Sequence, residues 1–131
     1  MRLLLDTHVV LWALLDDPRL PAAARSLILD PASEICVSAA SLWEIAIKHA
    51  LARGHQDDMP ISGAEALNWC REAGYTILPV SGEHAVAVGA LPFLHRDPFD
   101  RLLVAQAAHE PMRLLTSDPA VKAYDDNIIL V

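Results

Sequence analysis

RLLLDTH, residues 2–8, is the stretch of sequence that decides the fold. Its three leucines do not alternate with polar residues, which indicates a strand that is buried on both faces. Such strands are typical of parallel sheets that are covered by helices on both sides. Asp6 follows the run directly, and an unpaired charge at the end of a buried strand is costly. We therefore expect Asp6 to have a partner or a function at that end of the strand.

Apolar runs of strand length alternate with helical patterns along the rest of the chain. Further strands are predicted at residues 34–37, 75–80, 112–116 and 128–131. Helices are predicted between them at residues 9–15, 22–29, from Ser38 or Ser41 to 53, 62–73, 81–90, 97–109 and 119–124. This alternation predicts an α/β fold of three layers, with a central, mostly parallel sheet and helices on both faces.

Local signals mark several helix ends. Thr7 is expected to cap the first helix, and Pro21 is expected in the first turn of the second. Ser62 and Glu65 have the spacing of a capping box, in which each residue satisfies the other's backbone N–H. Gly74 is expected to end the helix that this box begins.

Composition limits the class of protein. A chain of 131 residues fits one domain, residues 1–131, and its 53% hydrophobic but only 5% aromatic content predicts an aliphatic core. No apolar run approaches the roughly 20 residues of a membrane span, so we expect no membrane association. Cys36 and Cys70 lack the spacing of a zinc or redox motif, and two buried thiols agree with a location in the cytoplasm.

The net charge of −7 argues mildly against a protein that binds nucleic acid. Such proteins normally carry a basic surface. Two bound divalent cations would offset four of these negative charges, and a basic partner could cover others. A nucleic-acid function therefore requires metal ions or a partner protein.

Acidic residues recur where the predicted strands end. In α/β sheets, ligands bind beyond the carboxyl ends of the strands. Asp6 and Asp118 follow two of these strands, and Glu44 lies in the first turns of the helix after a third. Asp97 and Asp100 lie at the start of another helix. All five carboxylates can therefore converge on one edge of the sheet.

Each acid also has a purely structural explanation. Asp97 precedes Pro98, so it is expected to be an N-cap, and Asp118 could cap the short helix after it. Glu44 and Lys48 are four residues apart on a helix and could form an exposed ion pair. The apolar neighbours of Glu44 nevertheless favour a buried side chain.

Clustered carboxylates raise each other's pKa unless a cation neutralises them. Oxygen ligands without His or Cys favour Mg²⁺ or Mn²⁺, and these ions suit phosphodiester hydrolysis. A Gly-rich phosphate loop is absent, which argues against hydrolysis of nucleoside triphosphates. A phosphatase that works through an aspartyl-phosphate is also disfavoured, because Asp6-Thr7-His8 lacks the second Asp of an Asp-x-Asp pair.

Four segments resemble the PIN-domain nucleases, most closely the VapC-type toxins of bacterial type II toxin–antitoxin systems. They are LLLDTHV (3–9), SLWEI (41–45), DPFDRLLVAQA (97–107) and LTSD (115–118). The resemblance covers essentially the whole chain in order, and DPFDR is its most specific part.

The resemblance implies an endoribonuclease that depends on Mg²⁺, with Mn²⁺ as the alternative. It also implies an RNA substrate, a cognate antitoxin that enters the active-site groove, and a homodimer or a larger toxin–antitoxin assembly. Asp97 becomes an auxiliary acid. A catalytically silent PIN-like module that binds RNA or protein is the alternative, and the intact acidic set opposes it. The catalytic, metal-binding carboxylates carried over from the family are Asp6, Glu44, Asp100 and Asp118.

Polar residues near these acids are given supporting roles by the same resemblance. Thr116 or Ser117 is expected to hydrogen-bond a carboxylate or a metal-bound water, and Thr7 is placed with them. Arg101 is expected either to contact phosphate or to pair with a neighbouring acid.

Each of the histidines and tryptophans near these segments has two possible roles. His8 and His95 could contact RNA, although a capping or packing role is favoured for both. Trp12 and Trp43 are expected in the core rather than as platforms on which bases stack.

Overall fold

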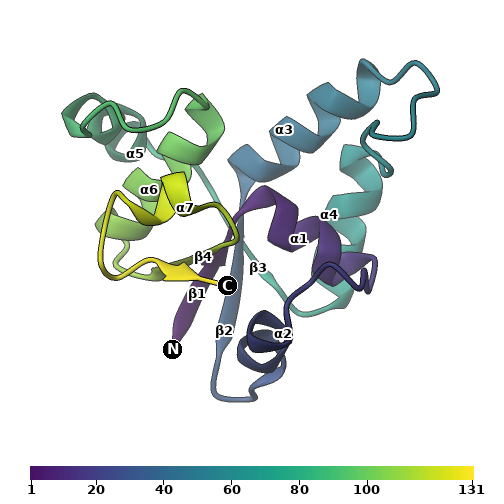
Figure 1. The fold of residues 1–131 in the computed structure, drawn as a ribbon, viewed down its shortest axis with the longest axis horizontal. Helices are drawn as coiled ribbons and strands as arrows, with labels where there is room; N and C mark the ends of the chain where they lie inside the picture. Colours follow the sequence, from purple (N-terminus) through teal and green to yellow (C-terminus); the bar gives the residue numbers. More distant parts are fainter.

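Five parallel strands form one sheet in the order β3-β2-β1-β4-β5 (Figure 1). The computed structural model describes all residues from 1 to 131. The sequence prediction of an α/β fold with a mostly parallel sheet is confirmed. The strands are β1 (Arg2–Leu5), β2 (Glu34–Ser38), β3 (Thr76–Leu78), β4 (Arg113–Thr116) and β5 (Ile129–Leu130).

Seven α-helices and one 3₁₀ turn connect the strands. A single long helix is expected at residues 81–90, but the structure has α5 followed by the 3₁₀ turn Val88–Ala90. The helices are α1 (Thr7–Leu14), α2 (Ala22–Leu29), α3 (Ala39–Ala50), α4 (Gly63–Glu72), α5 (Gly82–Ala87), α6 (Pro98–His109) and α7 (Pro119–Lys122).

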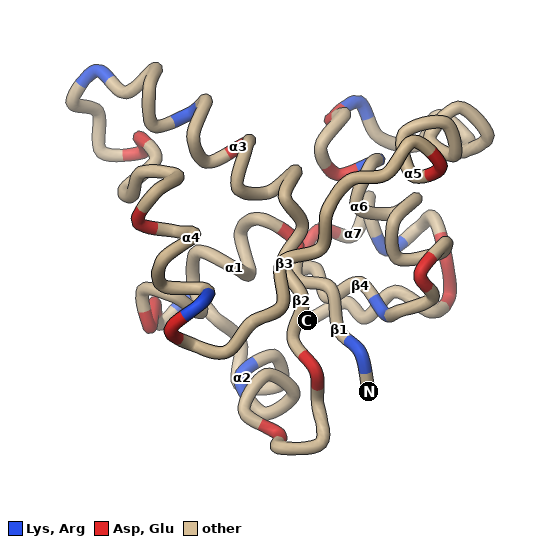
Figure 2. Tube along the Cα trace, turned by 180° about the vertical axis from the view of Figure 1, so that it is seen from behind, with Lys and Arg blue, Asp and Glu red and all other residues tan.

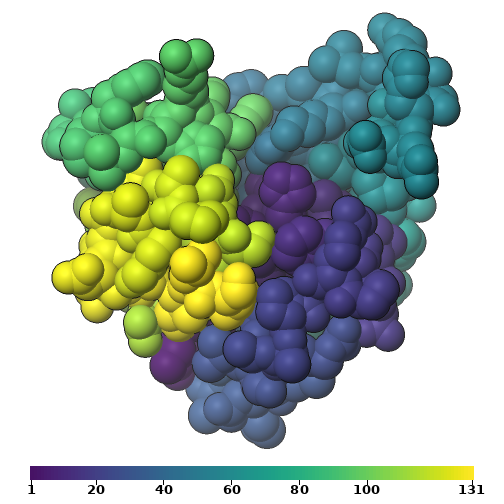
Figure 3. Space-filling model, viewed as in Figure 1, coloured from purple at the N-terminus to yellow at the C-terminus, as the bar shows by residue number.

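Helices cover both faces of the sheet, which confirms the three layers. Leu3 and Leu5 of β1 pack on one face with residues of α1, α2 and α4, whereas Leu4 packs on the other with α6 and α7. The alternation follows from the pleat of a strand, in which successive side chains point to opposite faces. The C-terminal Val131 packs against the first of these clusters, and the C-terminal segment accordingly borders α2 on the surface (Figure 3).

The strand order reverses direction at β1. From this strand the chain first builds outward through β2 and β3, and later returns to build outward through β4 and β5. A reversal of this kind leaves a crevice at the carboxyl ends of the two central strands. Asp6 follows β1 there, and Asp118 follows β4.

The structure corrects two of the predicted helix starts and decides between the two candidate caps of a third. Asp6, not Thr7, caps α1, because its carboxylate accepts a hydrogen bond from the Val9 N–H at 3.0 Å. Pro21 is the residue before α2 rather than its first residue. Ser38 caps α3, which leaves Ser41 inside the helix. The capping box of Ser62 is confirmed.

Several predicted bounds were too wide. α3 ends at Ala50 rather than at residue 53, and β3 covers only Thr76–Leu78 of the expected 75–80. Gly74 lies just after α4 with a φ of 80°, a conformation that glycine adopts without steric cost. Both cysteines are free and buried, as expected. None of the helices has the length and apolar character that crossing a bilayer requires.

Gly63 allows α3 and α4 to approach closely. A Cβ atom at this position would lie 2.9 Å from the Cβ of Ala46, whereas a Cβ at Gly82 would meet nothing within 4 Å. We expect Gly63→Ala to lower the free energy of unfolding by about 1–3 kcal/mol through overpacking. Gly82→Ala, the matched control, should be neutral or stabilising by up to about 1 kcal/mol. Urea denaturation measures both, and equal effects of the two substitutions would contradict the prediction.

Candidate active site

Asp6 lies buried at the carboxyl end of β1, with 4% of its surface exposed. One carboxylate oxygen accepts the Val9 N–H, and the other accepts the hydroxyl of Thr116 from β4. Burial raises the pKa of Asp6 above its ordinary value, although both hydrogen bonds act in the opposite direction. Asp6 therefore has the hydrogen-bond partners expected for a buried charge, but these two bonds do not fully offset its loss of solvation.

Thr116 links the ends of the two central strands. Its Oγ1 donates to Asp6 and accepts a hydrogen bond from the Asp118 N–H at 3.1 Å. Thr116 therefore has the position expected of a residue that orients a carboxylate. Ser117, the alternative, makes no side-chain hydrogen bond.

Asp118 caps α7, as the structural explanation for this residue predicts. Its Oδ1 accepts the Ala120 N–H at 2.9 Å, and its Oδ2 lies 3.0 Å from Nε2 of His95. Partial burial alone would raise the pKa of Asp118. The hydrogen bonds from Ala120 and His95 outweigh this effect and hold its pKa below the ordinary value. Asp118 is therefore ionised at neutral pH.

Glu44 is brought to the same edge by α3, and only 3% of it is exposed. Its Oε1 accepts the Thr7 hydroxyl at 2.6 Å, and its Oε2 accepts Nζ of Lys48 at 2.6 Å. The predicted pair with Lys48 therefore exists, but the glutamate is buried rather than exposed. Burial disfavours the charged form of Lys48, yet its bond to Glu44 keeps the lysine pKa above its ordinary value.

Asp97 and Asp100 separate into two roles at the start of α6. Asp97 is the N-cap and accepts the backbone N–H groups of Phe99 and Asp100. The carboxylate of Asp100 accepts no conventional hydrogen bond, and its one ion-pair contact is with Nε2 of His95 at 3.3 Å. Burial, and then repulsion from Asp97 and Asp6, raises the pKa of Asp100 to about 7.

The four predicted carboxylates lie together at the switch point of the sheet. Asp100 is close enough to Asp6 and Glu44 for their charges to raise its pKa, and Asp118 acts on Asp6 in the same way. Figure 2 shows acidic segments close together near the middle of the molecule, where α1 and α7 begin. Four separate segments of the chain therefore deliver one acidic cluster.

The contact between His95 and the acidic cluster is not predicted by the sequence. A capping or packing role was favoured for it, yet its Nε2 lies beside two of the four carboxylates, those of Asp100 and Asp118. One ligand atom from each of these three residues can be chosen so that all lie within 4.8 Å of one another. The only signal in the sequence was its position, two residues before the N-cap Asp97.

One alternative for Arg101 is not observed, and one expectation for a tryptophan was wrong. Arg101 pairs with no acid, because its Nη2 donates to the Val88 carbonyl and its guanidinium stacks on Phe93 at 5.0 Å, so contact with phosphate stays the prediction for this residue. Trp43 is not in the core, since 60% of it is exposed and its ring meets the edge of Phe99. Trp12 is partly buried against the core, as expected.

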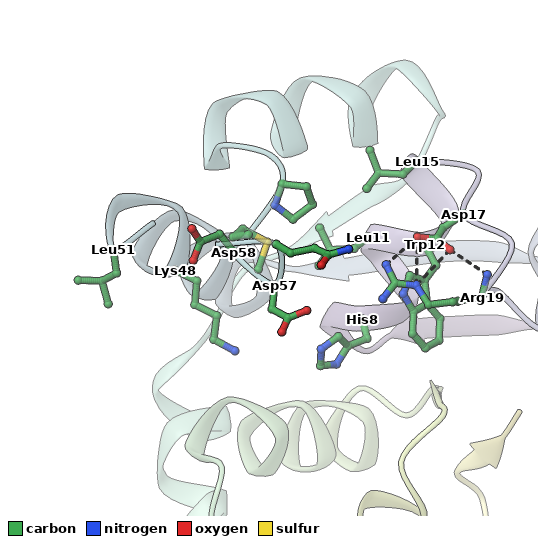
Figure 4. A pocket seen from close by; sticks show the side chains of 13 residues that line it. His8, Leu11, Trp12, Leu15, Asp17, Arg19, Lys48, Leu51, Asp57 and Asp58 are labelled. Atoms are coloured by element: carbon green, nitrogen blue, oxygen red, sulfur yellow. Dashed lines mark hydrogen bonds and ion pairs between the residues drawn. The ribbon is translucent and has the colours of Figure 1, made fainter. Parts of the chain in front are cut away.

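A groove adjoins the acidic cluster (Figure 4). It has a volume of about 640 Å³ and lies between α1 and the segment 56–60. His8, which is exposed, and Lys48 line its wall, whereas none of the four carboxylates does. Lys48 therefore connects the groove to the cluster through its ion pair with Glu44.

The donor set is suited to a hard divalent cation. Its oxygens are carboxylate oxygens, the ligands that Mg²⁺ and Mn²⁺ prefer. The carboxylate of Asp100 has no backbone hydrogen bond to give up, and its pKa is raised first by burial and then by the negative charge of Asp97 and Asp6. Asp6, Asp100, Asp118 and Glu44 could therefore hold such an ion.

Fold and site together define an α/β protein whose acidic residues gather at the carboxyl edge of a parallel sheet. The chain belongs to the PIN domain family, which matches residues 3–127.

Comparison with known proteins gives relatives of matching length. The chain is 31% identical over 124 residues to ribonuclease VapC22 of Mycobacterium tuberculosis, and the alignment covers 92% of this chain and 90% of that one. It is similar in structure to VapBC2 from Rickettsia felis bound to a DNA fragment from its promoter, with a TM-score of 0.70 and 19% identity over 100% and 98% of the two chains. A toxin–antitoxin complex from Klebsiella pneumoniae gives a TM-score of 0.65 and 16% identity over 96% and 94%.

The pKa values predict opposite effects of two isosteric substitutions on the metal-free protein. The carboxyl of Asp100 ionises near pH 4 in the unfolded chain but only near pH 7 in the folded one, so it lowers the free energy of unfolding as pH rises between these values. Asp100→Asn should remove this loss and raise stability at pH 8. Asp118 has a lowered pKa and stabilises the fold above about pH 4, so Asp118→Asn should reduce stability at pH 8.

Urea midpoints measured in EDTA from pH 5 to pH 8 check this pair of predictions. The difference between Asp100→Asn and the unaltered protein should grow as pH rises toward 8. A constant difference, or destabilisation by both substitutions at pH 8, would contradict it.

Proposed function

We propose that the chain is a metal-dependent endoribonuclease, the toxin of a type II toxin–antitoxin pair, with residues 1–131 forming one PIN-like nuclease domain. It hydrolyses RNA phosphodiester bonds with Mg²⁺, or with Mn²⁺ in its place. The observation that carries the proposal is the convergence of four carboxylates at the switch point, where Asp100 has a pKa of about 7. Membership of the PIN family and the ribonuclease named among the relatives support it.

Each acid has a part in this proposal. Asp6, Asp100 and Asp118 hold the cation, and Glu44 completes the set on the side of α3. Asp97 acts as an auxiliary acid through its charge, because its side chain is occupied as the N-cap of α6. Thr116 and Thr7 orient the carboxylates of Asp6 and Glu44.

Three side chains are placed to hold these ligands in one geometry during catalysis. A bound divalent cation would stabilise negative charge that develops on the phosphodiester oxygens. Thr116 fixes Asp6 relative to Asp118, so the ends of β1 and β4 move as one unit. Lys48 and Thr7 occupy one oxygen each of Glu44, which leaves this carboxylate a single orientation.

His8 and Arg101 are proposed to contact the RNA. His8 is exposed on the wall of the groove beside the cluster. Arg101 forms no ion pair with an acid, so its positive charge is free to balance that of a phosphate. Both contacts would partly compensate for the net charge of −7.

The proposed protein partners are a cognate antitoxin and a second copy of the chain, within a larger assembly of the two proteins. The toxin–antitoxin complexes among the similar structures support the antitoxin. Trp43 and Ile47 of α3 and its C-cap residue Leu51 are exposed and lie four residues apart, so they supply an apolar stripe for protein contact. A location in the cytoplasm stays a prediction.

Removing one ligand tests the nuclease directly. Asp6→Asn and Asp100→Asn should each lower Mn²⁺-dependent cleavage of single-stranded RNA at least about 100-fold, because each removes a charged oxygen from the cation. Glu72→Gln, an exposed acid on α4, is the matched control and should retain full activity. Initial rates on a labelled RNA, with and without EDTA, give the measurement.

The outcomes separate the alternatives. RNA binding without cleavage by the unaltered protein would favour the catalytically silent module. Cleavage that persists in both variants would refute the catalytic roles of Asp6 and Asp100 but not the nuclease activity. Cleavage unaffected by EDTA would refute the metal dependence.

The raised pKa of Asp100 also predicts how metal affinity depends on pH. A cation must displace the proton that this carboxyl holds below about pH 7. Mn²⁺ affinity should therefore rise about tenfold per pH unit below pH 7 and level off above it. Calorimetric titrations at pH 5.5, 6.5, 7.5 and 8.5 give the profile, and Asp100→Asn should flatten it. A profile that is flat in the unaltered protein would contradict the prediction.

A further inference from the structure

His95 bridges two carboxylates that come from different parts of the fold. Its Nε2 lies 3.0 Å from Oδ2 of Asp118, which follows β4, and 3.3 Å from Oδ2 of Asp100, which lies in the first turn of α6. Ligand atoms of the two acids and of His95 lie within 4.8 Å of one another, and no backbone N–H holds the carboxylate of Asp100 in place. His95 is the one side chain that contacts both.

The other nitrogen of the ring fixes which atom carries the proton. Nδ1 of His95 accepts the backbone N–H of Asp97 at 3.0 Å, so it presents a lone pair and not a hydrogen. In the neutral ring the hydrogen is then on Nε2, which faces the two carboxylates. Nε2 therefore donates a hydrogen bond to Asp118, lies 3.3 Å from Asp100, and has no lone pair for a metal ion.

The loop that carries His95 is itself held in place. The hydroxyl of Tyr124 accepts the backbone N–H groups of Leu94 and His95 at 3.1 and 2.9 Å. Tyr124 packs against the core cluster between the sheet and α6. The ring is thus fixed at three points: its own backbone, Nδ1 and Nε2.

We propose that His95 is a positioning residue, which sets the separation and orientation of Asp100 and Asp118 for the cation without binding it. This inference rests on the proposed metal-dependent function. Residues that hydrogen-bond metal ligands typically contribute a factor of 10–100 in metal affinity. His84 shows the same arrangement away from the site, with Nδ1 on the Ser81 N–H and Nε2 on Glu110.

The test compares Mn²⁺ affinity at pH 8 among three variants of the full chain. His95→Ala should weaken binding about 10-fold or more. His95→Gln should restore it to within about 3-fold, because the amide N–H can replace Nε2 as the donor. His55→Gln, at an exposed histidine between α3 and α4 that belongs to no group of potential metal ligands, is the matched control and should bind as the unaltered protein does.

A second variant keeps the test valid if His95→Ala fails to fold. Tyr124→Phe removes only the hydroxyl that anchors the loop, and it should weaken Mn²⁺ binding in the same direction by a smaller factor. Urea denaturation in EDTA should show little change for His95→Gln. A merely structural role would instead lower stability and leave the Mn²⁺ affinity of the folded fraction unchanged.

The visible spectrum of bound Co²⁺ separates positioning from ligation. We expect the spectrum of His95→Gln to match that of the unaltered protein, because the ligands are all oxygens. A changed spectrum would make His95 a ligand and overturn the inference. Unchanged Mn²⁺ affinity in His95→Ala would overturn it as well, while leaving the proposed function intact. An unaltered protein that binds neither ion would overturn both.

Discussion

The burial of Asp6 is the constraint on which the rest of the site depends. A carboxylate at the end of a strand with no exposed face needs hydrogen-bond donors, and each donor ties it to another element. Val9 supplies one from α1, and Thr116 supplies another from β4. Since the Asp118 N–H binds the same Thr116 hydroxyl, the two acids that follow β1 and β4 are fixed relative to each other by one side chain.

The four acids are not equivalent, and the difference follows from their partners. Asp6, Glu44 and Asp118 each accept two or more hydrogen bonds, whereas the Asp100 carboxylate has only the nearby His95. Burial and repulsion therefore act on Asp100 with little to oppose them, which is why its pKa rises to about 7 while that of Asp118 falls. The cluster combines three well-anchored carboxylates with one that is left open to an incoming cation.

The fold and the acidic set could be predicted from the sequence because the signals are local. Neighbouring residues alone are enough to recognise three of these signals. They are the uninterrupted leucines at 3–5, the Asp97-Pro98 start of α6 and the capping box at Ser62. The contacts of His95 with Asp100 and Asp118 depend on how separate segments pack, so they could not be predicted from neighbouring residues, whereas the Glu44–Lys48 pair could be predicted from its spacing but its burial could not. Thr7 was placed one position wrongly as a cap, because its hydroxyl binds Glu44, 37 residues away, and leaves capping to Asp6. Trp43 was misplaced for a related reason: Leu42 and Ile45 beside it on α3 pack into the core, whereas Trp43 lies on the opposite side of the helix with Ile47.

The junction between β1 and α1 has a consequence for how such chains can vary in length. A single residue, Asp6, separates the last residue of the strand from the first residue of the helix, and that residue is at once a cap and a member of the acidic cluster. Insertions and deletions there would displace the carboxylate, turn the helix and reverse the facing of the leucines together. The segment between α3 and α4 carries no residue of the acidic cluster, and only its last residues, the buried Ile61 and the N-cap Ser62, are fixed by packing and capping, so the rest can lengthen or shorten. Divergence among chains of this design is therefore expected to accumulate as indels around the rim of the groove, while the β1–α1 junction keeps a fixed length.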